Sequence, residues 1–434
     1  MDLGHNKEVF PEADVFPCIL VARKPDASAP PETARVCVLP REQTRVDDLS
    51  EQIATEGVAV PRSRFGAEPW NLEPPGVTKL MEKLGAVGVP LKEFIGASPL
   101  YGIKTGFNDA FLLDTATKDK LVAADPKCEP LFKPYLRGQD IDRWRAEWCG
   151  LWMLTMKSST NHDWPWADSL TEVDAEAALR AAYPSLHAHF TTYQTELKAR
   201  GNQGRYWWEL GGGSNWAQYD RPKIMYQEIQ FHPCYMIDNT GMLANNKVYL
   251  LPCGDLYLLG VLNSPLMWWH NWRHLPHMKD EALTPAGYRM EEVPIPKPTD
   301  EQRAAVETAV GRLIEITGAQ QEWRAAVLDW LRSEFAVEKP TQKLQALAGL
   351  GADEFAAEVK KAGKKGLGVA DLKRLKDEHA KSVLPLHKLA REAEQLERRV
   401  SDVVNAAFGL TPDDVKLMWD TAPPRMPIAR PAGQ

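Results

Sequence analysis

Cysteine is scarce in this 434-residue sequence, and no two of its six cysteines form a C-x-x-C pair. Disulfide-stabilised small domains and zinc ribbons both need closely spaced cysteines, so neither is expected. The sequence also lacks an apolar run long enough to span a bilayer, and its N-terminus, MDLGHNKEVF, lacks the basic-then-apolar pattern of a secretory signal. We therefore expect a cytoplasmic protein without a membrane segment.

An excess of positive charge is missing as well. Lysine and arginine number 52 against 59 aspartates and glutamates, which gives a net charge of −7 at pH 7. Proteins that bind nucleic acid usually neutralise phosphates with a basic excess. A nucleic-acid binder of this composition needs its basic residues gathered on one face, or a partner that supplies much of the backbone contact.

Motifs of the main catalytic classes are missing too. Enzymes that methylate exocyclic amines with S-adenosyl-L-methionine need a Gly-rich strand-to-helix turn and an (N/D/S)-P-P-aromatic loop, whereas the di-proline sites here read APPE, EPPG and APPR. Gly211–Gly213 follows no apolar strand, and the nuclease-like string Glu358–Lys360 lies in a charged helical stretch. The histidines include no H-E-x-x-H arrangement. We expect no catalytic residue and no metal ligand.

Tryptophan, by contrast, is abundant and concentrated. Eleven of the 15 tryptophans lie between residues 144 and 272. Indole rings bury large apolar areas, so core packing is the expected role of most of them. Trp207, Trp208 and Trp216 lie in a loop rich in glycine and asparagine, where base stacking or a wedge role is the alternative.

Composition and periodicity divide the chain into four parts and favour an α+β fold. Residues 1–60 carry strand-like runs and resemble the tail of an α/β domain. Residues 76–298 alternate short apolar runs with Gly, Pro, Asn and Asp, a pattern typical of a β-rich domain. Residues 299–420 form a helical region with a charged insert, and residues 421–434 form a tail expected to be disordered.

Within these parts the pattern predicts individual elements. Strands are expected at Val15–Val21 and Arg35–Leu39. Helices are expected at Asp47–Thr55, Gly76–Phe94, Asp174–Arg200, Glu301–Leu331 and Asp371–Phe408. The last two helices would pair antiparallel across a less ordered segment, Lys339–Asp371. Thr299 or Asp300 caps the first of this pair, and Gly409 ends the second.

Several phrases occur in an order that resembles one domain family. They are YGIKTGFNDAFLLD at Tyr101–Asp114, PLFKPYLRGQDIDRW at Pro130–Trp144, YPSLHAHFTTYQTELKAR at Tyr183–Arg200, PKIMYQEI at Pro222–Ile229 and LLGVLNSPL…VPIP at Leu258–Pro296. The series resembles the TaqI-like C-terminal specificity domain, the target-recognition part of type II restriction–modification adenine methyltransferases. Related domains occur in BREX phage-defence methyltransferases. The opening run, VFPEADVFPCILVARK, resembles the last strands of the methyltransferase core that precedes this domain.

The resemblance implies binding to double-stranded DNA and a separation of recognition from catalysis. The catalytic core of that family, with its cofactor loop and its (N/D/S)-P-P-aromatic loop, has no counterpart in this sequence. The methyltransferase core would therefore lie on another chain and would bind the S-adenosyl-L-methionine, or this chain is a truncated remnant. No cofactor is expected on this chain itself.

The residues expected to contact DNA lie in the polar parts of these phrases. In GIKTGFN, Gly102 and Gly106 would allow close backbone approach, and Lys104, Thr105 and Asn108 provide donors for phosphates and base edges. The alternative for this segment is a tight hairpin with a polar turn. Further candidates, for which a structural role such as a charge pair bracing a turn is the alternative, are Arg137, Arg143, Arg205, Lys223, Asn245, Asn246 and Lys247.

Three functions remain open from the sequence. The first is sequence-specific DNA recognition for a restriction–modification or phage-defence adenine-N6 methyltransferase. In the second, the chain counts as a site-specific adenine methyltransferase or type II restriction enzyme in its own right, with its catalytic part encoded nearby. In the third, the helical pair binds a protein partner and DNA contact is lost, which the acidic net charge favours.

Overall fold

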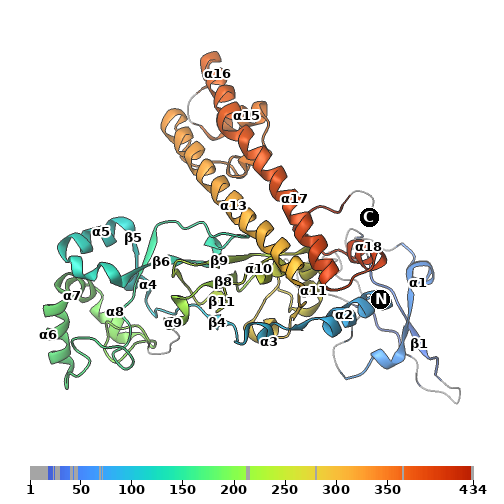
Figure 1. Ribbon diagram of the computed structural model, residues 1–434, viewed down its shortest axis with the longest axis horizontal. Coiled ribbons are helices and arrows are strands. Elements are labelled where there is room, and N and C mark those ends of the chain that lie inside the picture. Colours follow the sequence, from blue (N-terminus) through green and yellow to red (C-terminus); the bar gives the residue numbers. More distant parts are fainter. Residues whose placement is uncertain are drawn as a thin grey trace.

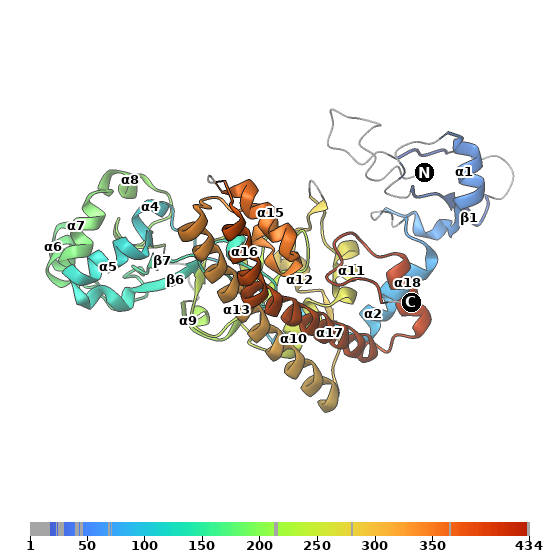
Figure 2. The same cartoon turned by 90° about the horizontal axis from the view of Figure 1, so that it is seen from above.

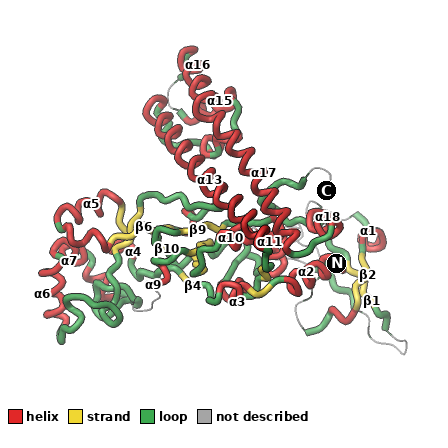
Figure 3. Tube along the Cα trace, viewed as in Figure 1, coloured by secondary structure: helices red, strands yellow, loops and turns green. Residues whose placement is uncertain are grey.

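The protein is an elongated body from which a pair of long helices projects as an arm (Figure 1). The computed structural model describes residues 18–22, 24, 30–39, 43, 47–67, 70, 72–211, 216–278, 281–363 and 366–431. Helices and short strands alternate along the body, and the arm is entirely helical (Figure 3). The expected α+β class is confirmed.

The N-terminal segment is a small unit at one end of the body (Figure 2). Strand β1 (Thr33–Val36) pairs antiparallel with β2 (Val58–Pro61), and helix α1 (Leu49–Glu56) connects them. Asp48 accepts hydrogen bonds from two backbone amides at the start of α1, which explains why the helix begins there. This confirms the expected helix. Of the strand expected at Val15–Val21, residues 15–17 lie outside the described residues, and Cys18 forms only an isolated bridge.

Two four-stranded sheets form the centre of the body. The first has the order β4-β11-β8-β9 and is antiparallel throughout, and the second has the order β10-β6-β7-β5, with one parallel pair between β10 and β6. The strands are β4 (Leu100–Tyr101), β5 (Leu112–Asp114), β6 (Phe132–Leu136), β7 (Leu151–Leu154), β8 (Lys223–Gln227), β9 (Tyr235–Asp238), β10 (Leu243–Ala244) and β11 (Val248–Leu251). A third, two-stranded sheet joins β3 (Val89–Pro90) to β12 (Pro294–Ile295).

Helices contribute more residues than strands between 76 and 298, so this region holds more helix than the alternating apolar runs suggested. They are α2 (Pro75–Val87), α3 (Leu91–Ile95), α4 (Asn108–Phe111), α5 (Thr115–Ala124), α6 (Glu172–Ala182), α7 (Pro184–Thr191), α8 (Gln194–Ala199), α9 (Trp216–Tyr219), α10 (Leu256–Leu262), α11 (Pro265–His274) and α12 (Gly287–Met290). Short 3-10 turns lie at η1 (Arg62–Arg64), η2 (Pro126–Leu131) and η3 (Gly138–Asp140).

Two expected helices are interrupted. The helix expected at Gly76–Phe94 ends at Gly88, where a Cβ would lie 2.6 Å from the Cβ of Pro294, so only glycine lets β12 pack this closely. The helix expected at Asp174–Arg200 is three helices, α6 to α8. Pro184 begins α7 because proline lacks the amide that would continue α6.

The sheet β4-β11-β8-β9 separates two hydrophobic cores. Along β8, the side chains of Ile224 and Tyr226 enter the core shared with α2, α10, α11 and the arm, whereas Met225 enters the core that contains β6, β7 and helices α6 to α8. This alternation is the two-residue period of a strand buried on both faces. Most tryptophans pack in these cores as expected, and Trp166, Trp208, Trp268 and Trp269 are fully buried.

The arm consists of α13 (Asp300–Phe335) and α17 (Leu384–Ala407), which lie side by side and antiparallel (Figure 1). Thr299 caps the 36-residue α13 through a capping box, and Gly409 follows α17 with φ +65, so both expected helix ends are confirmed. The segment before α17 runs through α16 (Val369–Glu378) and a π-helical turn, η6 (His379–Val383). No helix in the described part of the chain is both long and apolar enough to cross a bilayer.

Two segments expected to lack order are packed. Within residues 339–363, α14 (Gln342–Gln345), η5 (Leu347–Gly349) and α15 (Ala352–Ala362) form around a third core at the tip of the arm, because Leu344, Phe355 and Val359 bury their side chains there. After α18 (Pro412–Asp420), residues 421–431 return to the body. Ile428 is buried, and the carbonyl oxygen of Pro424 accepts a hydrogen bond from the Trp268 indole at 3.0 Å.

Glu397 on α17 connects the arm to residues 143–144 of the body. Glu397 on α17 lies 2.6 Å from Arg143 Nη1, and the same carboxylate oxygen accepts the Trp144 indole N–H at 3.0 Å. Trp144 has φ +74, a left-handed conformation that tryptophan rarely adopts, and its backbone amide donates to Tyr235 in β9. The segment 143–144 is therefore locked between sheet and arm.

Glu397→Gln is expected to lower the free energy of unfolding by about 2 kcal/mol, because Arg143 is largely buried and would lose its counter-charge. Urea denaturation followed by tryptophan fluorescence measures this change. Glu394→Gln, three residues away, is the control: its ion pair with Arg398 is exposed, so the loss should stay below about 0.5 kcal/mol. Equal losses in the two variants would contradict the role given to Glu397.

Candidate nucleic-acid interface

A pocket of about 760 Å³ brings together three polar segments that are far apart in the sequence. They are the loop 103–108 after β4, the turn 137–139 after β6, and the turn 245–247 between β10 and β11. We call this pocket the polar pocket. It is lined by the predicted site residues Lys104, Thr105, Gly106, Asn108, Arg137, Asn245, Asn246 and Lys247.

The segments meet because the backbone at Gly102 runs directly against residues 244–248. The amide of Gly102 donates to the carbonyl oxygen of Val248 at 2.9 Å, and that of Ile103 donates to Ala244 at 2.7 Å. A Cβ at position 102 would lie 1.9 Å from the carbonyl oxygen of Asn245. Gly102 was predicted to approach DNA, and its observed role is instead to let two stretches of this chain approach each other.

The loop 103–108 is held from behind by residues that follow α8. Arg200 is buried and donates to the carbonyl oxygen of Thr105 at 2.5 Å, and Asn202 donates to that of Lys104 at 2.5 Å. Arg200 also donates to the carbonyl oxygens of Trp207 and Glu209. Burial lowers the pKa of Arg200 to about 10, so the guanidinium stays charged at neutral pH. A buried, charged guanidinium therefore anchors the loop through hydrogen bonds from its two terminal nitrogens.

Arg200 was not among the predicted site residues. It ends the helix-like phrase YPSLHAHFTTYQTELKAR, and its place in that phrase was the only signal in the sequence. Gly106, with φ +76, packs against Arg200 and Asn202. A Cβ at position 106 would lie 2.9 Å from the carbonyl oxygen of Asn202. Glycine at 106 is thus required by the turn itself.

The side chains of the loop differ in what they offer to a ligand. Thr105 is buried and its hydroxyl donates to Asn108 Oδ1 at 2.6 Å, so it orders the turn. The turn leads from β4 into α4 and does not form the tight hairpin that was the alternative for this segment. Lys104 and Asn108 are exposed. In the described part of the chain, Lys104 Nζ forms no ion pair.

The other two segments combine braced and exposed groups. Arg137 binds the Asp140 carboxylate through Nε at 3.0 Å and Nη2 at 2.8 Å, which confirms that it braces a turn, but its side chain remains 42% exposed in the polar pocket. Lys247 is exposed and lies 2.7 Å from Glu228. Asn245 accepts the Lys247 amide and shapes the turn, which leaves Asn246 exposed at its tip.

Besides Gly102, three predicted site residues lie outside the polar pocket: Lys223, Arg143 and Arg205. Lys223 is completely buried, 2.5 Å from Asp238, and burial lowers its pKa, so it cannot touch DNA. Arg143 is committed to Glu397 in the arm. Arg205 donates to the carbonyl oxygens of Ala167 and Ser169, where it ties down a loop of the second core.

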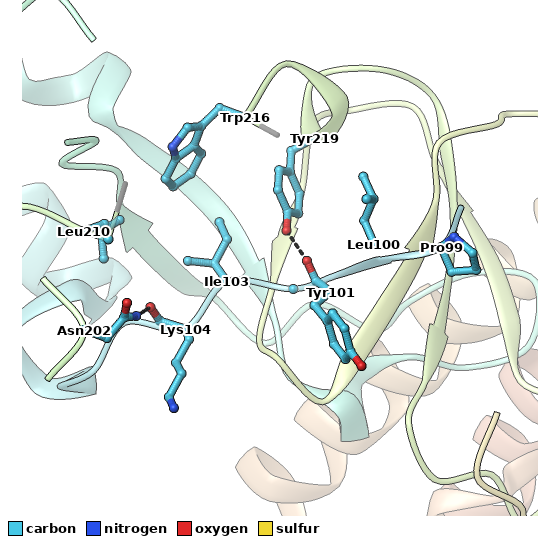
Figure 4. Close-up of a pocket in the computed structure, with 11 residues that line it drawn as sticks. Pro99, Leu100, Tyr101, Ile103, Lys104, Asn202, Leu210, Trp216 and Tyr219 are labelled. Carbon is cyan, nitrogen blue, oxygen red and sulfur yellow. Dashed lines mark hydrogen bonds between the residues drawn. The ribbon is translucent and has the colours of Figure 1, made fainter. Parts of the chain in front are cut away.

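A smaller cavity of about 340 Å³ adjoins the polar pocket through Ile103 and Lys104 (Figure 4). Gly102 and the half-buried Trp216 line it. Trp207 and Trp208 are buried, so neither can act as the stacking or wedge residue that the sequence left open.

The di-proline sites and the nuclease-like string that the sequence analysis considered for catalysis have structural roles where the structure describes them. Pro75 starts α2, Pro424 accepts the Trp268 indole, and Glu358 accepts the Thr341 hydroxyl. Gly212 and Gly213 lie outside the described residues. Across the described ranges, no three His, Cys, Asp or Glu side chains gather as a metal site requires.

Comparison with known proteins identifies two domain families. Residues 133–295 match the TaqI-like C-terminal specificity domain, and residues 299–404 match a domain of unknown function (DUF8810). The target-recognition domain expected from the sequence is thus confirmed; the phrase Tyr101–Asp114 precedes the matched residues. No curated protein matches the chain.

One similar solved structure is that of the type IIL restriction-modification enzyme MmeI in complex with DNA. The TM-score is 0.43 and the sequence identity 14%, and the similarity covers 86% of this chain and 40% of that one. This chain therefore spans about two fifths of the length of that enzyme.

Gly102→Ala is expected to lower the free energy of unfolding by about 3 kcal/mol, because the added methyl group would overlap the Asn245 carbonyl, which is backbone and cannot rotate away. Gly201→Ala is the matched control, since a Cβ at 201 meets nothing within 4 Å, and its effect should stay within about 1 kcal/mol. Urea denaturation of both variants tests this. A Gly102→Ala protein as stable as Gly201→Ala would disprove the required backbone approach.

Proposed function

We propose that this chain, whose residues 133–295 form a TaqI-like C-terminal specificity domain, reads a short duplex DNA sequence for an adenine-N6 methyltransferase of a restriction–modification or phage-defence system. The catalytic core lies on another chain. The observation that carries the proposal is the meeting of segments 103–108, 137–139 and 245–247 in one polar pocket. Three turns that present amide and cationic groups together match what a base-reading surface needs.

Each exposed group of the polar pocket matches a chemical group of a DNA duplex. Lys104, which is free of ion pairs in the described chain, and Lys247 at the rim supply charge for phosphates. The carboxamides of Asn108 and Asn246 supply the paired donor and acceptor that reads the major-groove edge of adenine. Arg137 is oriented by Asp140 and presents its remaining Nη1 edge.

The partner core would supply the rest of the chemistry. Because the amine of a paired adenine is inaccessible in the base stack, the methyltransferase must flip the base out before it transfers a methyl group. The partner would bind S-adenosyl-L-methionine, and this chain would hold the duplex in register. The acidic net charge of −7 supports an arrangement in which the partner provides much of the phosphate contact.

Lys104→Ala and Lys247→Ala should each weaken binding to a duplex roughly fivefold at 0.1 M salt and lower the salt slope by about 0.9, because each removes one phosphate contact. Fluorescence anisotropy with a labelled 30-base-pair duplex across a salt series measures both quantities. Lys416→Ala is the control: this lysine on α18 is 63% exposed and paired with Asp420, as Lys247 is 62% exposed and paired with Glu228.

Identical affinities and slopes in all three variants would remove the polar pocket from the DNA interface. Failure of the unmodified protein to bind any duplex at 50 mM salt would favour the protein-interaction function instead.

Asn246→Ala should act on sequence reading rather than on general affinity. Once a preferred site has been selected from random duplexes, the variant should bind that site roughly tenfold more weakly and bind an unrelated duplex as before, since an asparagine–adenine pair contributes about 1–3 kcal/mol of discrimination. Parallel titrations with both duplexes provide the test. Equal weakening on both duplexes would assign Asn246 to the backbone instead.

A methyl-transfer assay tests whether catalysis lies on a separate chain. The purified chain with radiolabelled S-adenosyl-L-methionine and duplex DNA should incorporate no label. Addition of the methyltransferase chain encoded next to it should give labelled adenine. Incorporation by this chain alone would establish the second function, that of a methyltransferase in its own right.

A further inference from the structure

Four tyrosines form a continuous row across the sheet β4-β11-β8-β9. The strand register places Tyr101 opposite Tyr249, Tyr249 opposite Tyr226, and Tyr226 opposite Tyr235. Their ring centroids are 4.6, 5.3 and 5.4 Å apart in that order, and Tyr249 and Tyr226 are stacked with an interplanar angle of 7°. Cross-strand aromatic pairs of this kind stabilise a sheet and restrict ring motion.

The row runs from the core to the surface. Tyr235, Tyr226 and Tyr249 are buried, whereas Tyr101, on the edge strand, is 60% exposed. The backbone of Tyr101 is also held, because its carbonyl oxygen accepts the Tyr219 hydroxyl (Figure 4). Within the described chain Tyr249 is the only ring that Tyr101 contacts. One side of an immobilised ring is therefore open to solvent.

The open ring and Lys104 of the polar pocket line one cavity. The side chains of Tyr101 and Lys104 project to the same side of the segment 100–104, away from Trp216 and Tyr219 (Figure 4). Lys104 lines both cavities. An aromatic face next to a lysine fits a nucleotide, since the ring can stack on a base while the ammonium group binds its phosphate.

A base within an intact duplex has both faces covered by its neighbours, so an aromatic ring cannot stack on it. The Tyr101 ring can stack only on a base that is unpaired and unstacked. We propose that Tyr101 stacks on an unpaired base of the bound DNA, with Lys104 on an adjacent phosphate. This inference rests on the proposed function and adds the substrate form, DNA with an unstacked base, to the site.

The test compares two duplexes of the same 30 base pairs, one fully matched and one carrying a single unpaired adenine. Anisotropy at 50 mM salt should show the full-length protein binding the bulged duplex about tenfold more tightly, the range that base–aromatic stacking gives. Tyr101→Leu should abolish this preference and leave the affinity for the matched duplex unchanged. Tyr101→Phe should keep the preference, because the ring is retained.

Two further variants separate the contributions. Lys104→Ala should weaken binding to both duplexes by the same factor and leave their ratio intact. Trp323→Ala, which removes an exposed ring from α13 in the arm, should change neither the affinity nor the ratio.

The outcomes also distinguish this inference from the function on which it rests. If the protein binds matched and bulged duplexes equally, or if Tyr101→Leu keeps the preference, Tyr101 does not stack on a base although DNA recognition stands. If the protein binds neither duplex, the proposed function falls and the stacking role falls with it.

Discussion

The contact between the backbone at residues 102–103 and the backbone at residues 244–248 holds the two sheets together. Residues 243–251 belong to both sheets, since β10 pairs with β6 in one and β11 pairs with β4 and β8 in the other. The chain that follows β4 passes residues 244–248 at Gly102, and the absence of a side chain there leaves room for the Asn245 carbonyl. The polar pocket lies where these two backbone segments meet, so its geometry depends on main-chain contacts rather than on mobile side chains.

The charges of the protein are largely neutralised internally. Lys223 pairs with Asp238 between β8 and β9, Arg143 pairs with Glu397 of the arm, and Arg137 pairs with Asp140 within one turn. Such pairs reduce the positive charge available to a ligand, and Lys104 is the exposed cation at the polar pocket that keeps its charge unpaired within the described chain. Under the proposed function, affinity for a phosphate backbone is modest, and selectivity comes from carboxamide contacts in the polar pocket and from the Tyr101 ring in the adjoining cavity.

The phrase LRGQDIDRW connects this pocket with the arm. Arg137 lies in the pocket, and seven residues later Trp144, in its left-handed conformation, lies against Glu397 of α17. Further along, Glu147 pairs with Arg324 of α13 at 2.5 Å. Ion pairs therefore hold this short segment at both ends, to Asp140 beside the pocket and to α13 and α17 of the arm.

Local patterns in the sequence determined a good part of this structure. The capping residues Thr299 and Gly409 marked real helix ends, because a cap satisfies the backbone groups of its own helix and needs no distant partner. The ordered phrases also identified the specificity domain and most residues of the polar pocket.

The tertiary structure alone decided which polar residues remain free for a ligand. Lys223, Arg143 and Arg205 look like Lys104 in the sequence, yet their partners come from elements 15 to 254 residues away. The same reason explains the break at Gly88, the packed tail around Ile428 and the role of Arg200. A lysine's charge is a property of its residue type, but its availability depends on which acid, carbonyl or ring the fold places beside it, and that placement is a long-range property of the whole chain.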